Sequence, residues 1–202
     1  MKAITQASYG GPQVLELADI PTPQLKDDEV LVRVRNSSIN AGDDVLMKGD
    51  PYLVRAVFGL TRPRVKVRGR DTAGEVATVG AAVTRFEVGD AVYCESSTGS
   101  FAEFTRVPEK FVARKPNSLT MEQAGCVPLA AVTALQGLRK VGKVQPGQQV
   151  LIIGASGGVG SYAVQIAKAL GATVTGVCSA PKIAFVRALG ADSVIDYSTE
   201  SV

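Results

Sequence analysis

One stretch of the chain, residues 150–160, has the sequence VLIIGASGGVG and joins an apolar run to a glycine-rich turn. The apolar run is typical of a buried β-strand, and the residues after the turn have the period of a helix. Gly154, Gly157 and Gly160 form the pattern G-x-x-G-x-x-G between these two elements. Glycine lets the backbone approach phosphate groups, whose charge the amides at a helix N-terminus offset. The context favours a site for the pyrophosphate of a dinucleotide over a turn without a ligand.

The residues around this turn predict a strand–helix–strand–helix–strand unit. Strands are expected at 149–154, 173–178 and 193–197, and helices at about 158–170 and 181–189. A complete doubly wound domain joins two such units, with the dinucleotide lying across both. We therefore expect residues 149–197 to supply the first half only, which holds adenosine and pyrophosphate. Without the half that covers the nicotinamide, poor turnover is expected.

The rest of the chain has a different pattern. Residues 1–118 are predicted to be all-β, a barrel or sandwich, with strands at 14–20, 29–35, 74–80, 91–96 and 101–107. Residues 118–138 predict two short helices that are separated near Pro128. The first of them is capped by Thr120 and Gln123. The predicted domains are residues 1–120 and 121–202.

Composition excludes several kinds of chemistry. The chain has no histidine and three widely spaced cysteines, Cys94, Cys126 and Cys178. This excludes Ser-His-Asp hydrolysis and leaves too few ligands for a zinc–thiolate site, so the cysteines are expected to be reduced thiols in or near cores. A net charge of +3 gives no argument for nucleic-acid binding. No apolar run has the length of a membrane span or signal peptide, so we expect a cytoplasmic protein.

The end of the second Rossmann-type strand indicates which dinucleotide is preferred. An Asp or Glu there would accept hydrogen bonds from the ribose 2′-hydroxyl of NADH. This chain has the sequence GVCSAPK instead, with the hydroxyl of Ser179 and the cation of Lys182. These groups suit the 2′-phosphate of NADPH, so NADPH is favoured over NADH. The alternative for Lys182 is an ordinary solvated lysine in the first turn of a helix.

The whole chain resembles the medium-chain dehydrogenase/reductase superfamily, specifically its zinc-free quinone oxidoreductase branch. The resemblance rests on SSINAGD (37–43), GRDTAGEVATVG (69–80), VGDAVY (88–93), AGCVPLAAVTAL (124–135), GASGGVGSYAVQIAKALGA (154–172) and LGADSVIDY (189–197). It implies an α/β plus β fold: an N-terminal GroES-like β domain followed by a Rossmann domain, here a partial βαβαβ one. It also implies an active site in the cleft between the two domains.

The resemblance strengthens the expectation that no zinc is used. In the zinc-dependent alcohol dehydrogenases of this superfamily, a cysteine ligand occupies the position of Asn40. A histidine ligand occupies the position of Arg70, within Gly69-Arg70-Asp71, and the cysteine-rich lobe that holds structural zinc is missing here. Without a Lewis acid, oxidation of simple alcohols is not expected. Reduction of a quinone or an activated C=C bond by hydride needs only orientation, polarisation and a proton source.

The resemblance also implies roles for single residues. Asn40 matches an amide beside the nicotinamide, Asp43 its companion, and Thr133 a threonine whose hydroxyl approaches the nicotinamide. Tyr52 falls near a tyrosine that can donate a proton or hydrogen bond in related enoyl and quinone reductases, although a surface aromatic is an equal alternative. Asn40 has the alternative of a turn former. The residues expected to bind the cofactor are Gly154, Ser156, Gly157, Gly158, Val159, Gly160, Ser179, Lys182 and Tyr197, the last beside the 2′-phosphate.

Residues 61–71 have the sequence TRPRVKVRGRD, with Arg or Lys at every second position from Arg62 to Arg70. An extended backbone would place all five cations on one face. A solvated strand face is the simpler interpretation, and a guide for a phosphate-bearing substrate such as an acyl-CoA is the alternative. RNA binding is less favoured because no aromatic residues alternate with the cations.

Taken together, these features favour an NADPH-dependent, zinc-independent oxidoreductase that transfers hydride to a quinone or an activated C=C bond, as in an enone or alkenal. One alternative is an enoyl-thioester reductase, and the other is a non-catalytic nucleotide-binding fragment. A small-molecule substrate is expected, with no nucleic-acid or membrane partner. The open apolar edge of the first Rossmann strand predicts homo-oligomerisation or aggregation.

Overall fold

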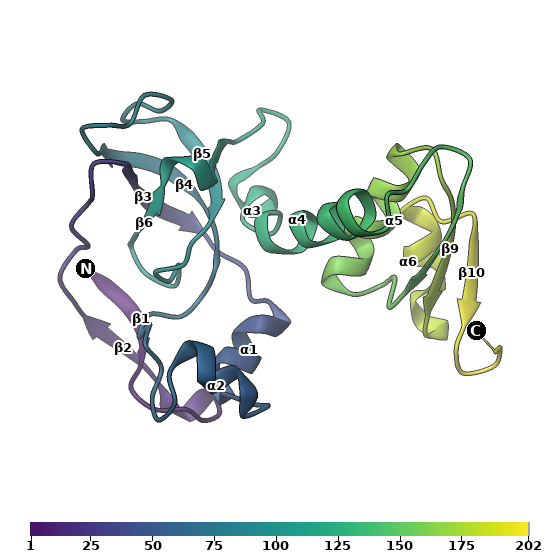
Figure 1. The fold of residues 1–202 in the computed structure, drawn as a ribbon, viewed down its shortest axis with the longest axis horizontal. Helices are drawn as coiled ribbons and strands as arrows, with labels where there is room; N and C mark the ends of the chain where they lie inside the picture. The colour runs from purple at the N-terminus through teal and green to yellow at the C-terminus, as the bar shows by residue number, and fades with distance from the viewer. Residues whose placement is uncertain (202) are drawn as a thin grey trace. The chain divides into compact units, whose positions relative to one another are not determined.

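The computed structural model describes residues 1–201 and shows two compact units, the first unit, Met1–Leu129, and the second unit, which begins at Ala130. The first unit has two sheets and the second has one (Figure 1), and each unit has its own hydrophobic core. The α/β plus β class is thus confirmed. The predicted boundary at residues 120/121 falls inside the first unit, at the N-cap of a short helix, and stays a prediction of where the two domains join.

The first unit contains two antiparallel sheets. In the smaller, β1 (Lys2–Gln6) pairs with β2 (Leu15–Asp19) after the short 3-10 helix η1 (Pro12–Val14). The larger has the order β6-β3-β4-β5-β7. Its strands are β3 (Glu29–Asn36), β4 (Asp71–Val79), β5 (Ala91–Glu95), β6 (Phe104–Pro108) and β7 (Val112–Arg114), with η2 (Glu109–Phe111) between the last two. All five strands predicted from the sequence are confirmed, and β7, only three residues long, was not predicted.

Alternating valines build the core of this larger sheet. Val30 and Val32 of β3 are fully buried, together with Val76 of β4, Val92 of β5 and Val107 of β6. Successive side chains of a strand point to opposite faces, so residues two apart reach the same core. The valine period that predicted β3 therefore also fixes the face that it buries.

Two helices interrupt the first unit, so the all-β prediction for residues 1–118 is wrong at this place. They are α1 (Ala41–Lys48) and α2 (Leu53–Phe58). The start of α1 is stabilised by the Asp43 carboxylate, which accepts the Asn40 N–H at 2.8 Å, and its end by Gly49 in the left-handed conformation, with φ 61°. Both helices are too short for a helical period to stand out in the sequence.

The two short helices predicted around Pro128 are confirmed as α3 (Met121–Ala124) and α4 (Pro128–Gln136), the second continuing as a π-helical turn, η3 (Gly137–Val141). At α3, the predicted capping box is present. Thr120 N–H donates to Gln123 Oε1 at 2.9 Å, and Gln123 N–H donates to Thr120 Oγ1 at 3.2 Å. No helix among residues 1–201 is long and apolar enough to span a membrane.

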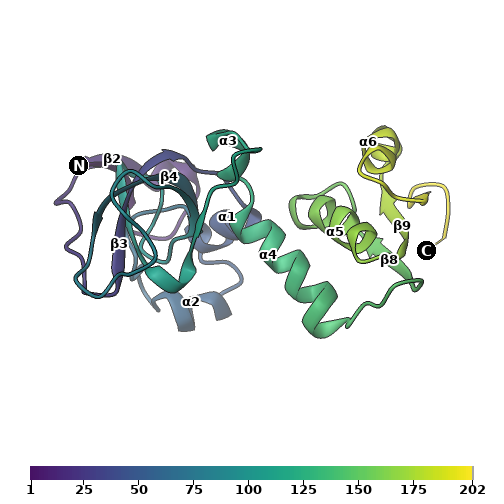
Figure 2. The ribbon, with the colours of Figure 1, turned by 90° about the horizontal axis from the view of Figure 1, so that it is seen from above.

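The second unit has the predicted strand–helix alternation. Its elements are β8 (Gln149–Ile153), α5 (Gly158–Ala169), β9 (Thr173–Cys178), η4 (Ala180–Lys182), α6 (Ile183–Ala188) and β10 (Ser193–Asp196). The three strands are parallel in the order β10-β9-β8. Helix α5 lies along β8 and β9 (Figure 2). Gly171, with φ 81°, follows α5 in the left-handed conformation, as predicted.

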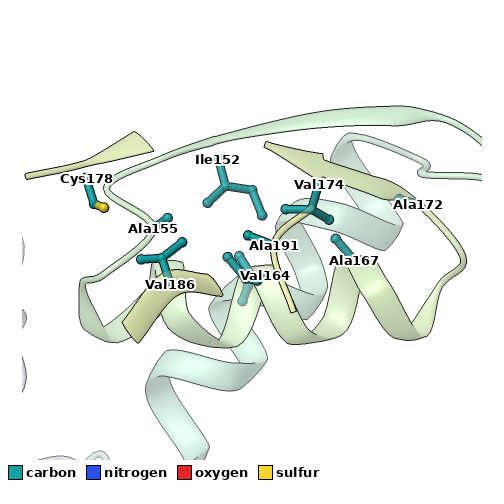
Figure 3. Packing of buried hydrophobic residues seen from close by; sticks show 11 residues of the cluster. Ile152, Ala155, Val164, Ala167, Ala172, Val174, Cys178, Val186 and Ala191 are labelled. Carbon is teal, nitrogen blue, oxygen red and sulfur yellow. The ribbon is translucent and has the colours of Figure 1, made fainter. Parts of the chain in front are cut away.

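One face of this parallel sheet is covered by both helices. Ile152 of β8 and Val174 of β9 point toward Val164 of α5, and Val186 of α6 joins the same cluster (Figure 3). In the structure Val164 is fully buried and Val159 is exposed, because the face is centred on Ala163, Val164 and Ala167.

Candidate functional site

The glycine turn connects β8 to α5 and leaves the first turn of the helix open. Gly154 adopts φ 72°, and its carbonyl accepts the Gly157 N–H at 2.9 Å. Gly157 is the N-cap and has no side chain to satisfy the helix amides. The first hydrogen bond back into the turn comes from Ser161 N–H to the Gly157 carbonyl, at 2.9 Å. The amides before it, from Gly158 to Gly160, have no intrahelical partner and can bind an anion.

Two glycines of the turn have different physical requirements. A Cβ atom at Gly160 would lie 2.1 Å from the Gly154 carbonyl oxygen, so this glycine lets the helix approach the strand end. A Cβ atom at Gly158 would meet no atom within 4 Å. The space before the first turn of α5 is therefore open, as a bound phosphate group requires.

We expect Gly160→Ala to lower the free energy of unfolding of the second unit by about 1–3 kcal/mol, because the helix must move away from Gly154. Gly158→Ala is the matched control and should change the free energy of unfolding by no more than about 0.5 kcal/mol. Urea unfolding followed by circular dichroism measures both. Equal stabilities of the two variants would contradict the account of the close approach.

The residues predicted to bind the ribose 2′-phosphate, Ser179, Lys182 and Tyr197, follow the carboxyl ends of β9 and β10. Asp196 of β10 lies opposite Cys178 of β9, so Ser179 and Tyr197, the next residues, share this edge of the sheet. Lys182 N–H donates to the Ser179 carbonyl at 2.9 Å, and the Lys182 side chain is exposed. The edge thus offers a hydroxyl, a phenol and a cation.

The buried carboxylate at this edge is already bonded within the protein. Asp196 Oδ1 accepts the hydroxyl of Ser198 at 2.7 Å and its N–H at 3.0 Å. These two bonds lower the pKa of Asp196. Asp196 ends β10, whereas the ribose-binding carboxylate that NADH would need is expected after the second strand, β9, where this chain has Ser179.

In the first unit, Asp71 organises the residues predicted to be catalytic. Its fully buried carboxylate accepts three hydrogen bonds: from Asn40 Nδ2 at 2.9 Å, from Ser38 Oγ at 2.7 Å and from the Leu129 N–H at 2.7 Å. The Asn40 amide also donates to Ser38 Oγ at 3.3 Å. The Asn40 side chain also takes part in a capping box at the start of α1, with Asp43 as the N3 residue.

Asp43 lies beside Asn40 because both belong to the start of α1. Its carboxylate is 7% exposed and accepts the Asn40 N–H. Burial raises the pKa of Asp43, and the nearby charge of Asp71 acts in the same direction. The hydrogen bond from Asn40 and the charges of Arg70 and Arg68 oppose this rise.

The side chain of Tyr52 contacts Arg55, whereas Asn40 and Asp43 contact each other. Its side chain is 76% exposed, and the guanidinium of Arg55 lies 4.4 Å from its ring centroid and 4.5 Å from that of Tyr9. Arg55 Nε also donates to the Gly49 carbonyl at 2.9 Å. Thr133, the fourth predicted catalytic residue, is an exposed residue of α4 in the second unit. The structure therefore brings Asn40 and Asp43 together by direct contact.

Asp71, described above, was not assigned a role from the sequence, and Arg68 was considered only as one of the five cations at 62–70. Residues 61–70 form no regular strand, so the prediction of five cations on one face is wrong. Arg68 is buried, and Arg70 is half-buried and forms an ion pair with Glu95. Arg62, Arg64 and Lys66 are exposed. The sequence around Asp71, GRDTAG, was the available signal for it.

The three cysteines differ in environment. Cys94 and Cys178 are buried, as expected, whereas Cys126 is exposed, contrary to the prediction of packed thiols. Burial raises the pKa of Cys94 to about 12, which makes it a poor nucleophile. Among residues 1–201, no cysteine and acidic side chains form a group of three or more that could hold a metal ion.

Comparison with known proteins finds two matching family models. One, described as "Alcohol dehydrogenase GroES-like domain", matches residues 26–117. The other, described as "Zinc-binding dehydrogenase", matches residues 158–202.

Curated relatives are similar to nearly the whole chain. The chloroplast envelope quinone oxidoreductase homolog of Arabidopsis thaliana is 38% identical over 208 residues, which cover 98% of this chain and 62% of the relative. The NADPH-dependent alkenal/one oxidoreductase of the same plant is also 38% identical, over 100% of this chain and 54% of its own length. The chain therefore spans less than two thirds of the length of these relatives.

Solved structures give the same result. The quinone oxidoreductase from Coxiella burnetii superposes with a TM-score of 0.88 at 33% identity, covering 100% of this chain and 63% of the other. The Escherichia coli quinone oxidoreductase complexed with NADPH superposes with a TM-score of 0.86 at 30% identity, covering 100% and 60%.

Proposed function

Because the chain belongs to the medium-chain dehydrogenase/reductase superfamily, in its quinone oxidoreductase branch, we propose that its function is the NADPH-dependent reduction of a quinone or an activated C=C bond. The observation that carries this proposal is the carboxyl edge of the parallel sheet. There, an open helix N-terminus follows a glycine turn, and a cation and two hydroxyl groups follow the next strands. The names of the quinone and alkenal/one oxidoreductases among the relatives support it.

The residues of the second unit fit NADPH in charge and in space. The amides of Gly158, Val159 and Gly160 would bind the pyrophosphate, and the missing side chain at Gly158 leaves the room for it. Ser156 belongs to the same turn. Ser179, Lys182 and Tyr197 would bind the 2′-phosphate, with Lys182 supplying the opposite charge. The bound cofactor supplies a hydride.

The residues of the first unit would orient the substrate and manage the proton. Asp71 holds the Asn40 side chain in one position through a 2.9 Å hydrogen bond, so the Asn40 amide would lie beside the nicotinamide and orient its carboxamide. Tyr52 Oη, on an exposed side chain that exchanges protons with water, would donate the proton that completes reduction. Thr133 is proposed as a hydroxyl contact to the nicotinamide, and Asp43 fixes the Asn40 backbone.

We further propose that zinc takes no part. Asn40 and Arg70 stand where the zinc-dependent relatives in this superfamily have cysteine and histidine ligands. A guanidinium carries a permanent positive charge and cannot ligate a cation, and Arg70 is paired with Glu95. The cytoplasm is the proposed location, and a homo-oligomer remains a prediction.

The test is a turnover assay on the 202-residue chain, with NADPH or NADH and three acceptors: a benzoquinone, a short enone and an enoyl-CoA. We expect the quinone or the enone to oxidise NADPH slowly, because the second Rossmann half is absent from this chain, and to oxidise NADH more slowly still. Faster turnover of the enoyl-CoA would favour an enoyl-thioester reductase. NADPH binding with no turnover of any acceptor would favour a non-catalytic nucleotide-binding fragment.

A further inference from the structure

The first unit contains a cavity of about 230 Å³, and its lining includes Asp43 and three arginines of the 62–70 segment. Its walls come from α1, from α2 and from the irregular segments 63–70 and 96–99. Most of the lining is apolar, including Leu46 of α1, Val57 and Phe58 of α2, and Val67. The volume lies just below the roughly 300–1,000 Å³ of pockets for drug-sized ligands, so the cavity fits a small molecule or one end of a larger one.

A buried guanidinium lies in the wall of this cavity. Arg68 is 8% exposed, and its Nη2 donates to the Val65 carbonyl. Its Nε is completely buried and has no hydrogen-bond partner among residues 1–201. No carboxylate of the described residues lies within ion-pair distance of it. Buried charges are normally paired, and a buried unpartnered donor in a native protein requires an explanation.

The neighbouring charges leave an excess of positive charge at the cavity. Arg70 also lines it but is neutralised by Glu95, and exposed Arg64 adds a second cation. Asp43 is the acidic residue of the lining, and its carboxylate is directed to the Asn40 N–H. Burial lowers the pKa of Arg68, and the nearby Asp43 carboxylate opposes this lowering; an anionic ligand would oppose it further.

We propose that this cavity binds the carboxylate of an otherwise apolar molecule, with Arg68 as the anion-binding residue. The planar fork of a guanidinium matches a carboxylate in shape and charge, whereas a dianionic phosphate would require more unpaired donors than one buried arginine supplies. The apolar body of the ligand would lie against Val57 and Phe58. This proposal rests on the proposed function, and it specifies the substrates of that function as enones or quinones that carry a carboxylate.

Binding is measured first, on the 202-residue chain, with octanoate and its neutral isostere octanamide as probes. Octanoate should bind at least about tenfold more tightly, since a hydrogen bond to a charged group gives a difference of this order. Arg68→Gln should abolish the difference. Arg62→Gln, which removes an exposed arginine outside the cavity lining and changes the net charge equally, should keep it.

Equal affinities for the two probes in the unaltered chain would overturn the proposal, and this comparison does not depend on any variant being folded. A preference that survives Arg68→Gln, or that Arg62→Gln abolishes equally, would also overturn it. Arg68→Lys keeps the charge without the fork, so it should retain part of the preference.

Turnover separates this inference from the proposed function. With NADPH, 4-oxo-2-nonenoate should have a kcat/KM at least about tenfold above that of its methyl ester, mostly through KM. Equal kcat/KM values would overturn the substrate class and leave the reductase intact. If neither compound is reduced while octanoate is still preferred, the carboxylate site stands and the proposed reductase function fails.

Discussion

Replacing Asp71 with asparagine is expected to lower the free energy of unfolding of the first unit by about 3–5 kcal/mol. Its carboxylate is fully buried and accepts hydrogen bonds from Asn40, Ser38 and the Leu129 N–H. Hydrogen bonds to charged groups contribute about 1.5–3 kcal/mol each, and unpaired buried donors cost about as much. The NH₂ group of the asparagine can only donate, so at least one of these three donors would lose its acceptor. Urea unfolding monitored by circular dichroism measures the change.

The neighbouring Thr72 provides the matched control. It is also fully buried, but its Oγ1 has no hydrogen-bond partner among residues 1–201. Thr72→Val removes that hydroxyl with little change in volume, so it should leave stability unchanged or raise it slightly. An Asp71→Asn chain as stable as Thr72→Val would show that the Asp71 network does not hold this region together.

Lys182→Ala is expected to weaken NADPH binding about tenfold to a hundredfold while leaving NADH affinity nearly unchanged. A charge-assisted contact to phosphate contributes about 1.5–3 kcal/mol, and NADH has no 2′-phosphate for this lysine to contact. Lys182 is exposed beside Ser179 at the carboxyl edge of the sheet, so its replacement should not disturb the core. Isothermal titration with each dinucleotide gives the two affinities.

Lys140→Ala is the control for net charge, because Lys140 is an exposed lysine of η3 in the same unit. It should leave the preference for NADPH intact. If both variants lose the preference to the same degree, long-range charge and not a contact at Lys182 would explain it.

The second unit could be predicted closely because its signals are local. Strand β8 is an apolar run and β9 is rich in β-branched residues. Gly154 marks the turn from β8 into α5, and Gly171 marks the turn from α5 into β9. Helices α1 and α2 were missed because their stability depends on contacts that a short sequence window does not contain. An example is Tyr9, whose hydroxyl donates to the Gly59 carbonyl at 2.6 Å, 50 residues along the chain.

The candidate residues of the first unit show the same limit. Asn40 and Asp43 were paired only through the family resemblance, and the structure shows them in direct contact at the start of α1. The role of Arg68 could not be predicted, because the alternation of cations at 62–70 suggested an extended strand. Gly59 with φ 124° and Gly69 with φ 85° instead let the segment turn, and Arg68 is buried in the wall of a cavity. Such burial depends on segments 96–99 and α1, far away in the sequence.

The most direct test of the central claim is a titration of the unaltered 202-residue chain with NADPH and with NADH under the same conditions. In the proposed site, Ser179, Lys182 and Tyr197 would bind the 2′-phosphate of NADPH, and residues 179–182 after β9 include no carboxylate for the 2′-hydroxyl of NADH. NADPH should therefore bind at least about tenfold more tightly than NADH. Equal affinities, or tighter binding of NADH, would contradict the claim that this edge is built for NADPH.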